Sequence, residues 1–146
     1  MNRIILVFGV FFIVSCGSSR LGKQALGIVE GKVVYEQGNR MPGEVMKKAS
    51  GVKREICIFE LTNLGSGNNS LIPFEEIKNN PLKTAISDEE GNFKIELEVG
   101  KYTLLIKEKN GYFVPLLDKE NNLNPIMVER GKTNLGTYVI NYAAYY

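Results

Sequence analysis

Residues 84–112, TAISDEEGNFKIELEVGKYTLLIKEKNGY, decide the fold of this chain. Apolar residues alternate with charged residues over 93–98, and a second alternation with a period of two follows over 102–107. A period of two places successive side chains on opposite faces of a β-strand. The apolar sets are Phe93, Ile95 and Leu97 in the first segment and Tyr102, Leu104 and Ile106 in the second. We therefore predict two half-buried strands here.

Aspartate and glycine mark the turns beside these strands. Asp88 can bond to its own backbone and Gly91 can adopt a positive φ, which predicts a short hairpin loop into the strand at 92–98. Gly100 predicts the next tight reversal. Asn110 and Gly111 form the pair favoured in a two-residue hairpin turn. The predicted structural turn residues are therefore Asp88, Gly91, Gly100 and Gly111.

Further strand patterns lie outward from this stretch. They cover residues 29–35, 55–62, 83–87, 126–129 and 135–142, and no long amphipathic helix accompanies them. Together with the two strands above they make about seven, which suits a sandwich of two antiparallel sheets. The predicted fold class is all-β, a seven-stranded antiparallel β-sandwich after an N-terminal signal segment.

Two connections are long for such a domain. Residues 36–54 carry Met41-Pro42-Gly43 and two basic pairs, and residues 63–82 open on a run rich in glycine, asparagine and serine. The second connection predicts one short helix that starts near Pro73. Loops of this length are functional or mobile.

Composition bounds the function. The chain has 146 residues, of which 44% are apolar and 23% charged, a formal net charge of +2 and no histidine. This length supports one domain. The lack of histidine excludes Ser-His-Asp triads and most catalytic zinc sites, and the small net charge gives no support for nucleic-acid binding. We therefore expect no enzyme activity, no cofactor, no metal site and no nucleic-acid partner.

The N-terminus has the features of a secretory signal. Arg3 precedes an apolar run, Ile4–Val14, which as a helix would span about 16 Å and is too short to cross a bilayer core of about 30 Å. The sequence Ile13-Val14-Ser15-Cys16 resembles the lipobox of bacterial lipoproteins. That resemblance implies cleavage before Cys16 and acylation of this cysteine. We expect a signal peptide over 1–15, the lipidated Cys16 with a flexible tether over 16–26, and a β-sandwich domain over 27–146.

Cys57 is then the one remaining thiol of the mature chain. It lies within the strand-like run Glu55–Leu61. We predict that it belongs to the core, since a free cysteine in an oxidising compartment is tolerated best when it is buried.

Four segments share motifs with a known family. GIVEGKVV at 27–34, TAISDEEGNF at 84–93, GKYTL at 100–104 and GY at 111–112 resemble the carboxypeptidase regulatory-like domain, whose fold is a transthyretin-like (prealbumin-like) sandwich. Ser87 stands where the family usually has threonine, and the connection at 36–54 is longer than the family's turn. The resemblance implies that Gly91 and Gly111 serve turns and that Phe93 and Tyr102 supply core area.

The same resemblance implies a non-catalytic module of secreted or envelope proteins. With the leader, it predicts a lipid-anchored adaptor or protein-binding module of the cell envelope. Gly17 after the cysteine, with no acidic residue through Gly27, predicts a position at the outer membrane, facing the periplasm. Its partners would be the membrane, through the acyl chains on Cys16, and an envelope protein. The alternative is a carbohydrate- or peptide-binding accessory lipoprotein for nutrient uptake. An unpaired edge strand would favour a protein partner, whereas exposed aromatic side chains on one sheet face would favour a sugar.

Other kinds of site have weaker signals. The acidic run at 88–92 lacks the ligand spacing of a calcium loop, and the adjacent carboxylates at 75–76 diverge on any element. Transthyretin-related hydroxyisourate hydrolases need histidines, which this chain lacks. Collagen-adhesin B-type domains carry an isopeptide-promoting glutamate where this chain has Ile106, although Glu108 follows two residues on. The tyrosines near the C-terminus fit strand packing or, alternatively, a sugar-stacking platform; they are Tyr138, Tyr142, Tyr145 and Tyr146.

Overall fold

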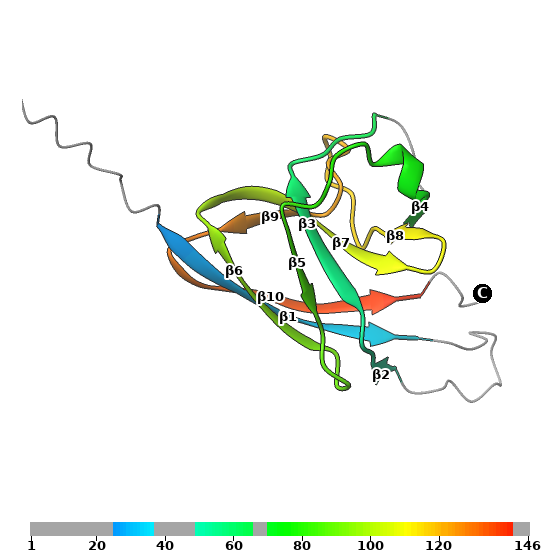
Figure 1. Ribbon diagram of the computed structural model, residues 1–146, viewed down its shortest axis with the longest axis horizontal. Helices are drawn as coiled ribbons and strands as arrows, with labels where there is room; N and C mark the ends of the chain where they lie inside the picture. Colours follow the sequence, from blue (N-terminus) through cyan, green and yellow to red (C-terminus); the bar gives the residue numbers. More distant parts are fainter. Residues whose placement is uncertain (1–24, 37–48, 66–69, 142–146) are drawn as a thin grey trace, which may run out of the picture.

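The computed structural model describes residues 25–36, 49–65 and 70–141, and their regular secondary structure is almost entirely β-strand (Figure 1). One 3₁₀ helix, η1, covers Phe74–Glu76 directly after Pro73, where the sequence predicts a short helix. The strands are β1 (Leu26–Tyr35), β2 (Ser50–Gly51), β3 (Glu55–Glu60), β4 (Leu71–Ile72), β5 (Lys83–Ile86), β6 (Asn92–Glu98), β7 (Gly100–Glu108), β8 (Gly111–Phe113), β9 (Pro125–Val128) and β10 (Gly131–Ile140). The predicted all-β class is confirmed.

Each of the seven predicted strand regions contains a strand. The structure adds three short strands that the sequence did not predict, β2, β4 and β8, so the predicted number of strands is too low. The alternation in β6 is confirmed, because Phe93, Ile95 and Leu97 are buried while the residues between them are exposed.

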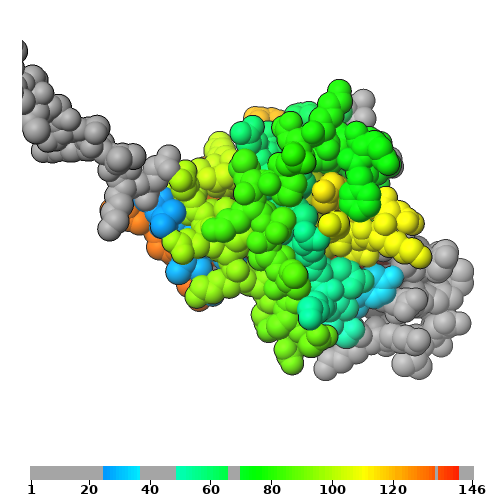
Figure 2. Space-filling model, viewed as in Figure 1, coloured from blue at the N-terminus to red at the C-terminus, as the bar shows by residue number. Residues whose placement is uncertain are grey.

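The strands form two sheets. In the first sheet β1 is central, with β10 along one side and both β6 and β2 along the other. In the second sheet the order is β4-β8-β7-β3-β5, and β9 also pairs with β7. In the space-filling view of Figure 2, the side toward the viewer is covered largely by the green segments that include β5 and β6.

The purely antiparallel arrangement that we predicted is wrong at one pair of strands. β1 and β10 run parallel, with Gly27 opposite Gly131 and Tyr35 opposite Ile140 (Figure 1). Their register shifts between Glu30 and Lys32, where β10 contains Gly136 at a φ of 75°. Such a bulge adds a residue to one strand and bends it.

The predicted hairpin at Gly91 is also wrong, because this turn connects the two sheets, and the tight reversal predicted at Gly100 is present but likewise passes from one sheet to the other. β5 pairs with β3 in the second sheet, β6 pairs with β1 in the first, and β7 pairs with β3 in the second. The chain therefore crosses the sandwich at Asp88–Gly91 and crosses back at Val99. A true hairpin joins β7 to β8, but Glu108 pairs with Gly111, so its two loop residues are Lys109 and Asn110. That turn is shifted by one residue from the prediction.

The main core lies between the two sheets. Its buried residues are Val29, Val33, Phe93, Ile95, Leu97 and Ile140 from the first sheet and Ile56, Ile58, Leu104, Ile106, Phe113, Ile126 and Val128 from the second. Fully burying a side chain of this size contributes about 1.5–3 kcal/mol, so this layer dominates the stability.

A second, smaller core covers the outer face of the second sheet. Its buried residues are Cys57, Phe59, Ile72, Ile77, Leu105, Val114 and Leu123. β3 and β7 are therefore buried on both faces, and the prediction of a half-buried strand is wrong for β7, where residues 103–106 are all buried. The described part of the long connection at 63–82 supplies Ile72 and Ile77 to this layer, which gives it a structural role.

Several predictions fall outside the described residues. They concern the signal peptide at 1–15, Cys16, most of the tether, the greater part of the loop at 36–54, and Tyr142, Tyr145 and Tyr146. Within the described residues no helix is long and apolar enough to cross a membrane.

Replacement of Phe93 tests the register of β6. Phe93 is buried in the main core and its ring stacks on that of Tyr138, with centroids 6.3 Å apart, so Phe93→Ala should lower the free energy of unfolding by about 3–5 kcal/mol. Glu96→Ala, an exposed position on the other face of the same strand, should change it by less than about 0.5 kcal/mol. Chemical denaturation of the full chain measures both, and a larger loss for Glu96→Ala would contradict the register.

Candidate functional site

The four predicted turn residues do not form one site. Asp88 and Gly91 share the turn before β6, whereas Gly100 begins β7 at the opposite end of β6. Gly111 begins β8 at the far end of β7, where an added Cβ would lie 2.1 Å from the carbonyl oxygen of Ile72. The four residues therefore serve three separate reversals of the chain.

Asp88 closes its turn through its own side chain. Its Oδ1 accepts a hydrogen bond from the Asn92 backbone N–H at 2.7 Å, and its Oδ2 accepts one from the Asn92 side-chain amide at 3.1 Å. Hydrogen bonds from Asn92 to the charged form hold the pKa of Asp88 below its usual value. Among the described residues, no group of three or more aspartate, glutamate or cysteine side chains is placed to hold a metal ion.

Gly91 has the positive φ that the sequence predicts, 85°. It also lies closer to β1 than the sequence could indicate. Its carbonyl accepts a hydrogen bond from Val33 at 2.8 Å, and an added Cβ would lie 1.9 Å from the Val33 carbonyl oxygen. Gly51 in β2 packs as closely on the other side, since its added Cβ would lie 2.0 Å from the Glu90 carbonyl oxygen. Two glycines therefore allow the turn to contact both neighbouring strands.

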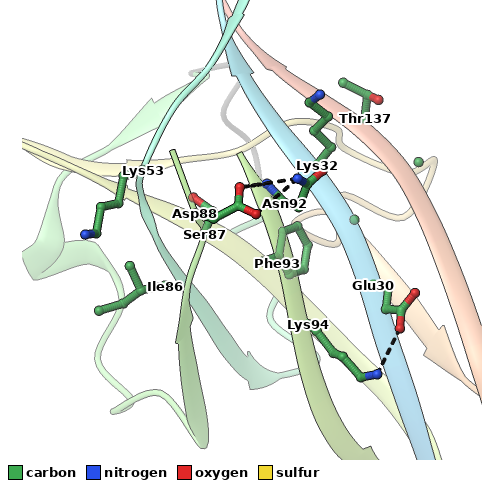
Figure 3. Close-up of a pocket in the computed structure, with 12 residues that line it drawn as sticks. Glu30, Lys32, Lys53, Ile86, Ser87, Asp88, Asn92, Phe93, Lys94 and Thr137 are labelled. Carbon is green, nitrogen blue, oxygen red and sulfur yellow. Dashed lines mark hydrogen bonds and ion pairs between the residues drawn. The ribbon is translucent and has the colours of Figure 1, made fainter. Parts of the chain in front are cut away.

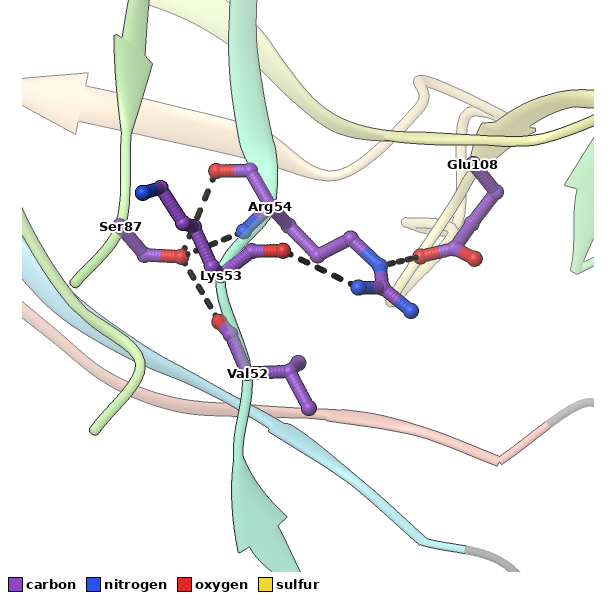
Figure 4. A network of polar contacts seen from close by, with 5 residues as sticks. All are labelled: Val52, Lys53, Arg54, Ser87 and Glu108. Carbon is purple, nitrogen blue, oxygen red and sulfur yellow. Dashed lines mark hydrogen bonds and ion pairs between the residues drawn. The ribbon is translucent and has the colours of Figure 1, made fainter. Parts of the chain in front are cut away.

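Ser87, next to this turn, joins β5 to the segment before β3 (Figure 4). Its side chain is buried, accepts a hydrogen bond from the Arg54 N–H at 2.8 Å and donates one to the Val52 carbonyl at 2.8 Å. Arg54 continues the network with an ion pair from Nε to Glu108 at 2.6 Å. These contacts fix the turn to the second sheet, and no alternation or turn motif in the sequence pointed to them.

An open cleft of about 860 Å³ lies beside this turn, and Figure 3 shows the residues that line it. Its charged side chains include both acidic and basic residues, and several of them form ion pairs. Glu30 pairs with Lys94 at 3.2 Å and with Lys132 at 2.6 Å, and these partners, Lys132 first, hold the pKa of Glu30 below its usual value. Lys53 pairs with Glu89 at 3.5 Å. Within the lining, Glu30 is thus neutralised by Lys94, and Lys53 by a glutamate just outside the cleft.

A second groove, of about 600 Å³, lies beside β10 and has a different character. Its lining residues are Ser70, Phe113, Val114, Pro115, Leu116, Asn124, Pro125, Ile126, Met127, Leu135, Thr137, Tyr138, Val139 and Asn141. None of these side chains is charged. Leu116 is 61% exposed, Met127 52% and Val139 39%. Among the described strands β10 pairs only with β1, so the groove lies along an edge strand.

The remaining candidates have structural explanations. Cys57 is buried in the second core, as predicted, and burial raises the pKa of its thiol to about 11, which keeps it unreactive at neutral pH. Glu75 and Glu76 are exposed in η1. Ile106 belongs to the main core, and the nearby Glu108 is paired with Arg54.

No family model matches the chain, and no match was found among curated proteins. Among solved structures, the chain is similar to a DUF3823 family protein from Parabacteroides merdae, with 19% identity, 77% of this chain and 46% of that chain covered, and a TM-score of 0.37. It is also similar to the minor pilin GBS52 of Streptococcus agalactiae (12% identity, 80% and 45% covered, TM-score 0.39). A third similar structure is that of the TIE protein of Bacillus anthracis, with 13% identity, 80% of this chain and 17% of that chain covered, and a TM-score of 0.39. The chain spans less than half the length of each, and likenesses of this size carry no functional inference.

Alanine at Gly91 tests the close contact between the turn and β1. Gly136 is the matched control, since its φ of 75° is similar but an added Cβ there would meet no atom within 4 Å. Gly136→Ala should lower the free energy of unfolding by about 1–2 kcal/mol, the strain of a left-handed alanine. Gly91→Ala should lower it by about 1–3 kcal/mol more, because the hydrogen bond from Val33 is displaced as well. Equal losses in denaturant titrations of the two variants would show that only the φ matters.

Proposed function

We propose that this chain is a lipid-anchored protein of the cell envelope whose β-sandwich binds another protein and catalyses no reaction. The lipobox resemblance at Ile13–Cys16 supports the anchor, together with the short apolar run before it. Several acyl chains on one cysteine hold a protein on a membrane stably, whereas a single chain does so only marginally. The absence of an acidic residue from Gly17 to Gly27 supports a position at the outer membrane, facing the periplasm.

The observation that carries the binding role is the groove beside β10. An edge strand with unpaired backbone groups is a template for another chain, and proteins that do not use such an edge usually protect it. The exposed apolar residues Leu116, Met127 and Val139 border the groove, and large apolar side chains grouped in this way mark interaction surfaces.

The alternative, a sugar-binding accessory protein, would need exposed aromatic rings on a sheet face. Every aromatic side chain in the described residues is buried or half-buried. Tyr138, the described member of the C-terminal tyrosine cluster, stacks on Phe93 in the core. A protein partner is therefore the better supported ligand class.

Metabolic labelling tests the lipid anchor. Cells that express the chain are given a fatty-acid analogue, and the wild type should carry the label while Cys16→Ser should carry none. Cys57→Ala is the matched control, because it removes the other cysteine of the chain and should leave the label unchanged. Equal labelling of the wild type and Cys16→Ser would refute the anchor.

Photo-crosslinking in intact cells tests the binding role. A photoreactive phenylalanine analogue is placed singly at the exposed positions Leu116 and Met127 beside the groove, and at Ile86 and Glu89 elsewhere on the domain. We expect discrete protein adducts at one or more of the four positions. If none forms an adduct while glycans bind the chain on an array, the sugar-binding alternative replaces this proposal.

A further inference from the structure

Two residues in the C-terminal half of β10 have backbone groups that bond to no other residue among those the structure describes. The Glu36 N–H donates to the Ile140 carbonyl oxygen at 2.9 Å, so Ile140 faces β1. Successive residues of a strand direct their backbone groups to opposite sides. Thr137 and Val139 therefore direct their N–H and C=O groups away from β1, toward the groove side. No hydrogen bond joins these groups to any other described residue.

The opposite edge of the same sheet is protected. The Val33 N–H donates to the Gly91 carbonyl, which by the same alternation turns the backbone groups of Lys94 and Glu96 away from β1. There the Lys83 side chain donates to the Glu96 carbonyl oxygen at 2.6 Å, and charged side chains alternate along β6. Lysine and inward-reaching charges are ordinary means of blocking an edge. The β6 edge of the first sheet is therefore blocked against strand pairing, whereas the β10 edge has no such protection over residues 137–140.

The groove beside β10 fits an extended chain. Its far wall comes from residues 113–116 and 124–127 of the second sheet and its connection, and it contains Pro115 and Pro125, which have no N–H to donate. The wall therefore supplies apolar surface, while β10 supplies the regular backbone groups. Among the strands that the structure describes, only β10 lies on this side of β1, so an added strand would extend the first sheet over the exposed Met127 and Leu116.

We propose that residues 137–140 of β10 bind an extended, uncharged segment of a partner protein as an additional strand of the first sheet. This inference rests on the proposed binding role and names its surface. Backbone hydrogen bonds to Thr137 and Val139 hold the segment, and every second side chain of the segment packs into the groove against Met127 and Leu116. The bulge at Gly136 interrupts the ladder and ends the pairing on that side. The residues that line the groove carry no charge, so an uncharged segment matches it in character.

The test uses the full chain in detergent solution and a capped octapeptide of alternating threonine and valine. On titration with the peptide, the backbone amide chemical shifts of Thr137 and Val139 should change and reach saturation. The chemical shifts of Lys94 and Glu96 should remain unchanged. Val139→Pro removes one outward N–H without touching the ladder to β1, and it should weaken binding about tenfold. Met127→Lys should weaken it similarly, and Ile86→Lys, at another exposed apolar position outside the groove, should leave it unchanged.

The outcomes separate this inference from the binding role. No saturable shift, shifts at β6, or unchanged affinity of Met127→Lys would each refute the β10 site, even where Val139→Pro does not fold. Sedimentation that shows dimers of the chain, lost in Met127→Lys, would also refute it, since a second copy would then occupy the edge. If in-cell adducts form at Ile86 or Glu89 while the peptide fails to bind, the binding role stands and the β10 site falls.

Discussion

The close contact between Gly91 and Val33 is the constraint on which the arrangement of the two sheets depends. At this point the chain leaves the second sheet after β5 and enters the first sheet as β6, and the Val33 N–H bonds to the Gly91 carbonyl at 2.8 Å. The distance allows no side chain at Gly91. Asp88 fixes the turn from within, and Ser87 ties its start to the backbone of residues 52–54. The bond to Val33 joins the turn to β1 at the end of the β1–β6 ladder, and the Ser87 bonds join it to the second sheet, so this turn connects both sheets.

The second constraint is that both faces of the β3–β7 pair are apolar and must be covered by other parts of the chain. Ile58 and Leu104 face the main core, whereas Phe59 and Leu105 face the smaller one, so neither face of this pair can be left in water. Ring contacts strengthen the outer layer, since Tyr112 meets Phe59 at 5.3 Å and Phe74 at 5.0 Å between centroids. The segment from β4 to Ile77 thus covers the apolar outer face of the second sheet, which lies away from the first sheet.

The sequence predicts the elements better than their pairing. Alternation at 93–98 locates β6 because that strand has one buried face, and the positive φ of Gly91 follows from its place in a turn. The pattern at 29–35 also locates β1, although the adjacent residues Val33 and Val34 are both buried there. Partner choice depends on contacts between distant residues, which no local pattern records. A short turn such as Val99 fits a hairpin and a crossing between sheets equally, and the parallel pairing of β1 with β10 has no local signal. The sequence does contain one feature that points to the groove, since no residue from Thr133 to the C-terminus is charged. None of the predictions made from the sequence rests on this feature.

That uncharged run explains why the two edges of the first sheet differ. Chains that must avoid edge association place lysine or glutamate along the strand, as β6 does with Lys94, Glu96 and Glu98. Residues 137–140 have none of these, although a lysine at the exposed Val139 would cost little stability. The other protective device, the bulge at Gly136, stands before this segment and leaves its backbone groups regular. The bulge at Gly136 therefore prevents a partner strand from pairing before residue 137, while the uncharged residues 137–140 allow pairing after it. This is the property expected of an edge that accepts one strand at one position.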